Sequence, residues 1–311
     1  MKKELVNEFS WSVSRAQLFR QCRRAYYYNY YGSWGGWNPD APKPVRKMYI
    51  LKNLKNLALW GGSIVHDTVR DALMYYRDGA SEFPTVEQLQ ARARQTLRNG
   101  WTEAVSRQWE KTPKATNLFE LYYGNGRTLP AEQTSRLKEV VYDALDNFRH
   151  SGVLKEILAV PMNDWLTVDK LTSFQVDGTK VWCALDFAWR DTDGNVQIID
   201  WKTGGEHSEN LRQQLGCYGL YAMEAWKVGA EQIKPSGVFL NDGGRRSHYS
   251  VDATLLFNVK EQILQSIQNM RSCLKDKDNN VAEEEDFPFT DSPDNCLTCP
   301  FREICPACGK D

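Results

Sequence analysis

The stretch VWCALDFAWRDTDGNVQIIDWK, residues 181–202, decides the fold of the centre of the chain. It contains two apolar runs that are rich in β-branched and aromatic residues. The tripeptide Asp193-Gly194-Asn195 joins them, and such a sequence favours a tight turn between antiparallel strands. The stretch therefore predicts a β-hairpin. Because side chains alternate along a strand, we expect Ala184, Asp186 and Ala188 on one face, with Leu185, Phe187 and Trp189 on the other.

The second strand of the hairpin brings further charges to the same face. Ile198, Asp200 and Lys202 share a face, and antiparallel pairing places Asp200 near Asp186. An exposed ion pair between Asp200 and Lys202 is one explanation, contributing at most about 1 kcal/mol. However, partly buried carboxylates repel each other unless a cation lies between them, and oxygen ligands favour Mg²⁺ or Mn²⁺. The hairpin thus predicts a divalent-metal site, with Lys202 roughly 6–7 Å from Asp200 and able to hold a water molecule.

Helical patterns dominate the chain before the hairpin and alternate with strands after it. Before it we expect helices at 14–31 (capped by Ser14), 45–59, 60–76, 86–110 and 131–150. After it we expect a helix at 206–228, strands at 236–242 and 247–251, and a helix at 254–275. This order predicts a mixed α/β core with a helical addition.

Composition places limits on the class of protein. A chain of 311 residues with 41% hydrophobic residues can bury a full core. It has no run of roughly 20 apolar residues, and its first residues lack a secretory apolar region, so we expect a cytoplasmic protein without a membrane partner. The net charge of −1 does not by itself indicate nucleic acid, although Arg20, Arg23 and Arg24, or Arg245 and Arg246, can form a local basic patch.

Eight cysteines in a chain without a signal peptide favour metal or redox chemistry over disulfides. Cys296, Cys299 and Cys305 follow the spacing C-x2-C-x5-C, and Cys308 is the nearest candidate for a fourth ligand. Cys183, Cys217 and Cys273 fall within regular elements, where small buried apolar residues are expected.

The motifs ALDFAW and IIDWKTG resemble those of the PD-(D/E)XK nucleases. Within that superfamily they are similar to the RecB-like branch, which includes the AddB nuclease domain and the CRISPR-associated RecB-type exonucleases. The helical motif QQLGCYGLY supplies Gln214 and Tyr218 four residues apart, and GGSIVH supplies His66. Ala184 stands where that branch usually has glycine.

The resemblance implies a site and a fold. It implies an α/β fold with a restriction-endonuclease-like mixed sheet flanked by helices, a large helical N-terminal part and a C-terminal cysteine cluster. It assigns His66, Asp186, Asp200 and the carbonyl of Trp201 to Mg²⁺ or Mn²⁺, Lys202 to the attacking water, and Gln214 and Tyr218 to orienting substrate or bracing the site.

The resemblance also points to a [4Fe–4S] cluster held by Cys22, Cys296, Cys299 and Cys305. Cys22 is followed by Arg23, where related sequences usually have proline. Such a link would close a loop of more than 270 residues and stabilise the fold by roughly 5–6 kcal/mol in the chain-entropy model. The alternative is a Zn²⁺ site formed by Cys296, Cys299, Cys305 and Cys308.

The function implied is that of a metal-dependent DNA nuclease, an exonuclease acting on single-stranded ends. DNA is the expected substrate, with a helicase or another DNA-processing protein as a further partner. The alternatives are a non-catalytic nucleic-acid-binding or assembly subunit and an iron–sulfur electron-transfer protein; the chain lacks the glycine motif of a dinucleotide site.

We expect one integrated domain with four parts. These are an N-terminal helical segment at 1–60, a helical region with an insertion at 61–160, the nuclease core at 161–275 and the iron–sulfur segment at 276–311. Within the insertion, Trp101, Trp109 and Tyr122 are candidates to stack on bases or to pack in a core.

Overall fold

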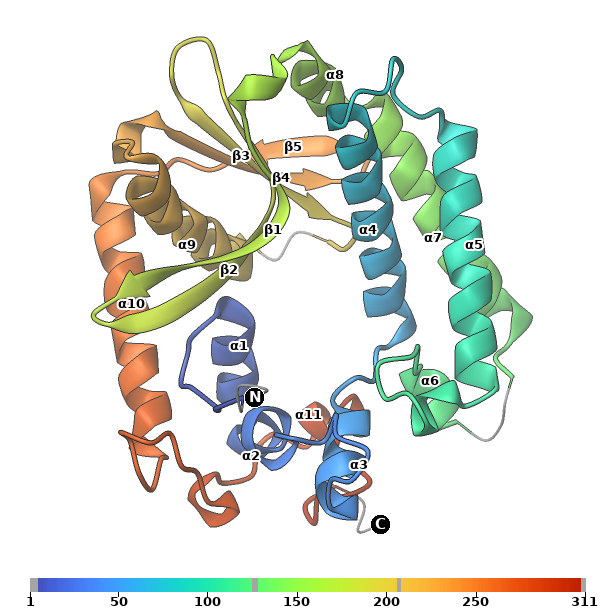
Figure 1. Ribbon diagram of the computed structural model, residues 1–311, viewed down its shortest axis with the longest axis vertical. Helices are drawn as coiled ribbons and strands as arrows, with labels where there is room; N and C mark the ends of the chain where they lie inside the picture. The colour runs from blue at the N-terminus through green and yellow to red at the C-terminus, as the bar shows by residue number, and fades with distance from the viewer. Residues whose placement is uncertain (1–4, 125–127, 206–207, 309–311) are drawn as a thin grey trace.

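A mixed five-stranded sheet organises the protein, as the computed structural model of residues 5–124, 128–205 and 208–308 shows (Figure 1). Its order is β1-β2-β3-β4-β5, and only the β3–β4 pair is parallel. The strands are β1 (Trp165–Val176), β2 (Thr179–Arg190), β3 (Val196–Lys202), β4 (Ile233–Phe239) and β5 (Arg245–His248). The predicted α/β class with a mixed sheet flanked by helices is confirmed. The sequence reading did not predict β1.

The β2–β3 hairpin forms as the sequence predicted, but its two strands separate early. Pairing covers residues 187–190 with residues 196–199 and goes no further. In the turn, Gly194 has a φ of +80°, and the Asp191 carboxylate accepts the backbone N–H groups of Asp193 and Asn195. The separation leaves one edge of β2 open beyond Phe187.

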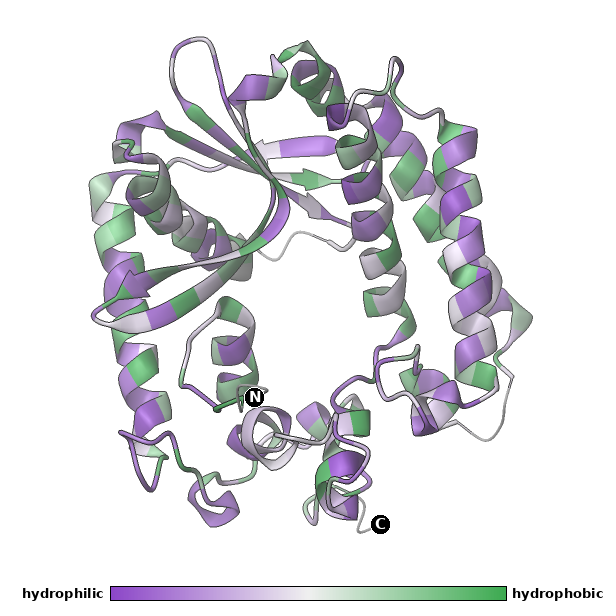
Figure 2. Ribbon diagram, viewed as in Figure 1, coloured by the Kyte–Doolittle hydropathy of each residue, from purple (hydrophilic) through white to green (hydrophobic). Residues whose placement is uncertain are grey.

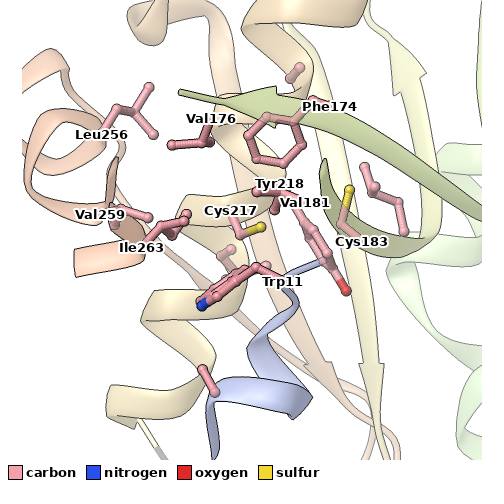
Figure 3. Packing of buried hydrophobic residues seen from close by; sticks show 14 of the residues in the cluster. Trp11, Phe174, Val176, Val181, Cys183, Cys217, Tyr218, Leu256, Val259 and Ile263 are labelled. Carbon is pink, nitrogen blue, oxygen red and sulfur yellow. The ribbon is translucent and has the colours of Figure 1, made fainter. Parts of the chain in front are cut away.

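The N-terminal segment takes the edge of β2 that β3 leaves open. Trp11 forms a parallel bridge with Val181, accepting the N–H of Trp182 and donating its own to Lys180. The Trp11 ring is fully buried in the cluster that Figure 3 shows, and its Nε1 donates to Ser266 Oγ at 3.0 Å. The segment around Trp11 is thereby fixed between β2 and α10 (Ala253–Ser272).

Each face of the sheet has its own apolar core. Ile198 packs with α9 (Ser208–Trp226) and α10, whereas Ile199 and Trp201 pack with helices on the opposite side. Those helices include α4 (Leu57–Arg77), α5 (Val86–Val105), α7 (Ala131–His150) and α8 (Gly152–Ala159). This alternation follows the expected two-residue period of β3.

The alternation fails on β2, where the sequence expectation was wrong. Leu185 packs in the α9 cluster together with Ala188, while Phe187 and Trp189 pack in the α4 cluster. Opposite this point, Asp169 of β1 has a φ of +36°, and the two strands curve away from β3 (Figure 1). The distorted backbone changes the direction of side chains at Asp186.

The expected helix at 14–31 is also interrupted. α1 (Val13–Gln21) begins after Ser12, which caps it in place of Ser14, and ends at Cys22, whose backbone is extended. Cys22 Sγ then accepts the N–H of Ala25 and caps α2 (Arg23–Tyr27), which leads into the π-helical η1 (Tyr28–Gly32). Cys22 therefore lies at a corner between two helices.

The remaining elements connect these layers, and hydrophilic and hydrophobic residues are mixed along their ribbons (Figure 2). They are α3 (Lys43–Leu51), η2 (Gln108–Glu110), α6 (Phe119–Tyr122), η3 (Met162–Asp164), η4 (Ala230–Gln232), η5 (Glu284–Asp286) and α11 (Asp294–Leu297). The C-terminal segment returns to α2, where Arg24 pairs with Glu284 at 2.6 Å and donates to the Phe287 carbonyl at 2.8 Å. Within the described ranges, no helix is both long enough and apolar enough to cross a membrane.

Candidate active site and cysteine pocket

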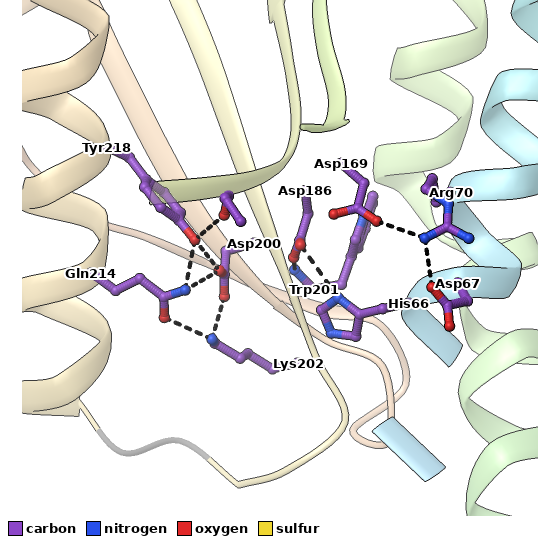
Figure 4. Close-up of polar contacts among 11 residues, drawn as sticks. His66, Asp67, Arg70, Asp169, Asp186, Asp200, Trp201, Lys202, Gln214 and Tyr218 are labelled. Carbon is purple, nitrogen blue, oxygen red and sulfur yellow. Dashed lines mark hydrogen bonds and ion pairs between the residues drawn. The ribbon is translucent and has the colours of Figure 1, made fainter. Parts of the chain in front are cut away.

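The charged residues of the hairpin lie between two helices, one from each side of the sheet (Figure 4). Asp200 and Lys202 come from β3, Asp186 from β2 and Gln214 from α9, while His66 comes from α4 on the other side. The glycines that precede His66 allow this approach. A Cβ atom on Gly62 would lie 3.0 Å from Thr203 Oγ1, so α4 passes very close to the loop that follows β3.

Asp200 is the most deeply buried charge of the site, with 2% of the residue exposed. Its Oδ1 accepts a hydrogen bond from Gln214 Nε2 at 2.8 Å, and its Oδ2 lies 2.6 Å from Lys202 Nζ without accepting a well-directed hydrogen bond. Gln214 Oε1 accepts from Lys202 Nζ at 2.9 Å. The glutamine thus connects the carboxylate and the ammonium into a closed triangle.

Tyr218 supports this triangle from one turn further along α9. Its hydroxyl accepts from Gln214 Nε2 at 2.6 Å and donates to the Ala184 carbonyl at 2.5 Å. The same oxygen lies 3.2 Å from Asp200 Oδ1. Burial and the nearby carboxylates raise the pKa of Tyr218 well above its usual value, so the hydroxyl stays protonated.

Asp186 faces the other helix. Its Oδ1 lies 3.3 Å from His66 Nδ1, and its Oδ2 accepts the backbone N–H of Trp201 at 2.7 Å. That N–H lies beyond the last β2–β3 pair, so the carboxylate replaces the missing strand partner. The side chain of Trp201 is buried in the α4 cluster, where its ring meets Phe148 edge to face.

The pKa shifts follow from two carboxylates close together in a buried place. Burial raises the pKa of Asp200, and repulsion from the Asp186 carboxylate raises this pKa further. The positive charge of Lys202 lowers the pKa and only partly offsets the rise. Burial disfavours the charged form of His66, but the carboxylate of Asp186 outweighs it and raises the imidazole pKa to about 9. Each carboxylate therefore has a cationic partner.

A third carboxylate lies beside the site, and the sequence reading missed it. Asp169 on β1 faces Asp186 across the strand pair, and burial together with the charge of Asp186 raises its pKa. Arg70 holds Asp169 at 3.3 Å and also contacts Asp67 at 2.5 Å (Figure 4). No local pattern around Asp169 predicts β1, so this carboxylate could not be placed beside Asp186 before the strand pair was known.

Five cysteines line one pocket at the other end of the protein. Cys22 comes from the corner between α1 and α2, and the C-terminal segment contributes the rest: Cys296, Cys299, Cys305 and Cys308. Burial, with smaller effects from Cys22, Cys305 and Cys296, raises the pKa of Cys299 to about 11. Cys308 interacts with the sulfurs of Cys296 and Cys305. The four predicted cluster ligands and Cys308, the alternative fourth ligand, therefore lie together. The other three cysteines are buried, as the sequence reading expected.

The geometry limits what these groups can hold as they stand. In the described part of the chain, no three His, Cys, Asp or Glu side chains form a group that could hold a metal ion. At the hairpin site, Lys202 and His66 already neutralise the two carboxylates. Even so, one imidazole and two carboxylates suit a hard divalent ion, and Asp200 Oδ2 accepts no hydrogen bond.

The aromatic candidates of the helical insertion separate into two environments. Trp109 and Tyr122 pack with their ring centroids 5.3 Å apart beside a pocket that includes Lys47 and Glu303. Trp101 instead packs against the α4 cluster.

Comparisons with known proteins give a family and little further detail. A family model described as the PD-(D/E)XK nuclease superfamily matches residues 10–306. No curated protein matches the sequence. Among solved structures, a chain described as "Crystal structure of SSO0001" is similar at 15% identity and a TM-score of 0.30, over 81% of this chain and all of that one.

Proposed function

Because the chain belongs to the PD-(D/E)XK nuclease superfamily, we propose that it hydrolyses phosphodiester bonds in DNA at the site formed by Asp186, Asp200 and Lys202. The observation that carries this proposal is the Asp200–Gln214–Lys202 triangle, which holds a buried carboxylate and an ammonium group at the opening of the strand pair. The family match covers most of the chain and includes all of these residues.

His66, Asp186 and Asp200 would hold a divalent ion, Mg²⁺ or Mn²⁺, with the carbonyl of Trp201 as a further ligand. When bound, such an ion stabilises charge on the phosphate and lowers the pKa of a coordinated water. To serve as a ligand, His66 must release the proton that Asp186 stabilises. Asp200 must likewise give up its contact with the Lys202 ammonium to become a ligand.

The side chains around these ligands have separate tasks in this proposal. Once freed from Asp200, the Lys202 ammonium orients the attacking water and offsets negative charge on the phosphate. Gln214 keeps Lys202 close to Asp200, and Tyr218 fixes the amide of Gln214. Asp186 orients the imidazole of His66.

The finer assignment rests on the RecB-like resemblance. We propose that the enzyme is an exonuclease acting on single-stranded ends, working with a helicase or another DNA-processing protein. A [4Fe–4S] cluster held by Cys22, Cys296, Cys299 and Cys305 would fasten the C-terminal segment to the first helices. The pocket that these four cysteines share supports a common site for them, and Cys308 lines the same pocket.

A nuclease assay tests the proposal. End-labelled single- and double-stranded DNA is incubated with Mn²⁺ and the parent, Lys202→Ala or Asp200→Asn. Lys155→Ala serves as a control, because Lys155 is exposed on α8, away from the site. We expect the parent and the control to shorten single strands from one end, and both site variants to lose at least about 100-fold in rate while remaining folded.

Two results would contradict the proposal. Equal cleavage by the parent and both site variants would place the activity elsewhere. No cleavage by a folded, Mn²⁺-loaded parent on any substrate would favour the non-catalytic binding subunit.

A further inference from the structure

A wide groove runs beside α10 on the side of the molecule that carries α1 and α2 (Figure 1). Its volume is about 1350 Å³, larger than the roughly 300–1,000 Å³ of most small-molecule pockets. Its walls come from α1, α2, α9 and α10 and from residues 288–295 of the C-terminal segment. A cavity of this size and length suits a polymer better than a small molecule.

The charge of the groove is positive although the chain as a whole is nearly neutral. Arg20, Arg23 and Arg212 line it, all three are exposed, and Asp291 is the one carboxylate among the lining residues. Among the carboxylates whose side chains the structure describes, none forms an ion pair with any of the three arginines. Three guanidinium groups are therefore available to bind anions.

Side-chain amides form a stripe along the wall opposite the arginines. Asn258, Gln262, Gln265 and Asn269 follow each other at three- and four-residue intervals, so they lie on one face of α10. All four are exposed, and the stripe is about 16 Å long. Amides donate and accept hydrogen bonds, so they can pair with the edges of bases of any sequence.

The groove and the candidate active site share helix α9. Gln213 lines it and directly precedes Gln214, which holds Lys202. Arg20 donates to Gln213 Oε1 at 3.4 Å and so links α1 to α9. The groove also shares Cys22 and Phe289 with the cysteine pocket.

We propose that this groove binds single-stranded DNA and holds the strand whose end enters the candidate active site. The inference rests on the proposed function. The arginines contact phosphates and the amides of α10 contact base edges. Phe289 is 39% exposed and carries the Arg24 guanidinium over one face of its ring, which leaves the other face for stacking. At about 3.4 Å per stacked nucleotide, the amide stripe spans roughly five nucleotides.

The lining favours a nucleic acid over an acidic protein segment. The centre of a protein interface is enriched in exposed aromatic and apolar residues and poor in polar ones. Here Phe19 and Val259 are buried in the wall, and half of the twenty lining residues are amides or arginines, with Phe289 as the exposed aromatic ring. That composition suits a chain of phosphates and polar bases.

Fluorescence anisotropy with a labelled 15-nucleotide oligo(dT) tests the proposal. Binding is measured at several salt concentrations, without added divalent metal, and a gel confirms that the probe stays intact. The test variant is Arg20→Ala/Arg23→Ala/Arg212→Ala. The matched control is Arg136→Ala/Lys155→Ala/Lys260→Ala, which removes the same charge from exposed positions outside the groove. Gln262→Ala/Gln265→Ala probes the stripe.

We expect the arginine variant to bind at least about tenfold more weakly at low salt. The slope of log K against log salt should fall in magnitude by about 2, since each phosphate contact to a single strand contributes roughly 0.7. The glutamine variant should bind more weakly with an unchanged slope, because amides release no counterions. The control should match the parent in both quantities.

The proposal is overturned if the arginine variant matches the control, or if the parent does not bind the probe. An acidic protein partner would produce the first of these results. Failure of the nuclease proposal is distinguishable, since it would leave groove-dependent binding intact while the Mn²⁺ assay shows no cleavage.

Discussion

His66 Nδ1 lies 3.3 Å from Asp186 Oδ1, and this pair joins α4 to β2 at the point where β2 separates from β3. In the metal-free protein the imidazole therefore carries a proton at neutral pH, because the carboxylate raises its pKa to about 9 against the opposing effect of burial. The two residues are 120 positions apart, so tertiary structure alone creates the pair.

The first prediction concerns this ionisation. An NMR titration of His66 in metal-free protein should give a pKa near 9, and Asp186→Asn should return it to or below its ordinary value. Since the folded-state pKa is the higher one, the stabilisation is complete below pH 6.5 and is lost as pH rises through 9. Thermal unfolding should therefore show the parent, but not Asp186→Asn, losing stability over that range. A pKa near 6.5 in the parent would contradict the pairing.

The second prediction concerns Gln214. Gln214→Ala removes the link between Asp200 and Lys202 without touching either, so DNA hydrolysis should slow by about 10–100-fold. Gln95→Ala, an exposed change on α5, should have no effect. Rates are measured with Mn²⁺ on end-labelled single strands. Parent-like activity of Gln214→Ala would remove the glutamine from the proposed machinery.

The third prediction concerns the anchoring of the chain start. Trp11→Ala leaves a cavity between β2 and α10 and breaks the bond to Ser266, so unfolding in urea should show a loss of about 3–5 kcal/mol. Trp34→Ala, at a residue that is 38% exposed, should cost less than about 1 kcal/mol. Equal losses in the two variants would mean that the Trp11 site is not a packed core position.

The fourth prediction concerns the cysteine pocket. Protein purified without oxygen should absorb at about 400 nm and contain iron and sulfide. Cys299→Ser and Cys22→Ser should lose the absorbance, whereas Cys308→Ser and the buried Cys273→Ser should keep it. The proposed ligand set would be contradicted by colourless protein that contains stoichiometric zinc. It would also be contradicted if Cys22→Ser kept the absorbance while Cys308→Ser lost it.

The sequence by itself determined the parts of the fold that depend on local pattern. The turn at Asp193-Gly194-Asn195 and the two β-rich runs required a hairpin, and the two-residue period of β3 put Asp200 on the face of α9 and Trp201 on the other. The helix at 131–150 has the predicted ends, and its buried residues Val141, Ala144, Leu145 and Phe148 repeat at helical spacing.

Tertiary structure decided everything that depends on distant contacts. It ended the first helix at Cys22. It also distorted β1 at Asp169, which changed the direction of the side chains near Asp186 and brought the Asp169 carboxylate beside the site. It also placed the arginines of α1 and α9 across a groove from the amides of α10. Local propensities act over a few residues, whereas these arrangements arise where segments far apart in the chain share the burial of apolar surface.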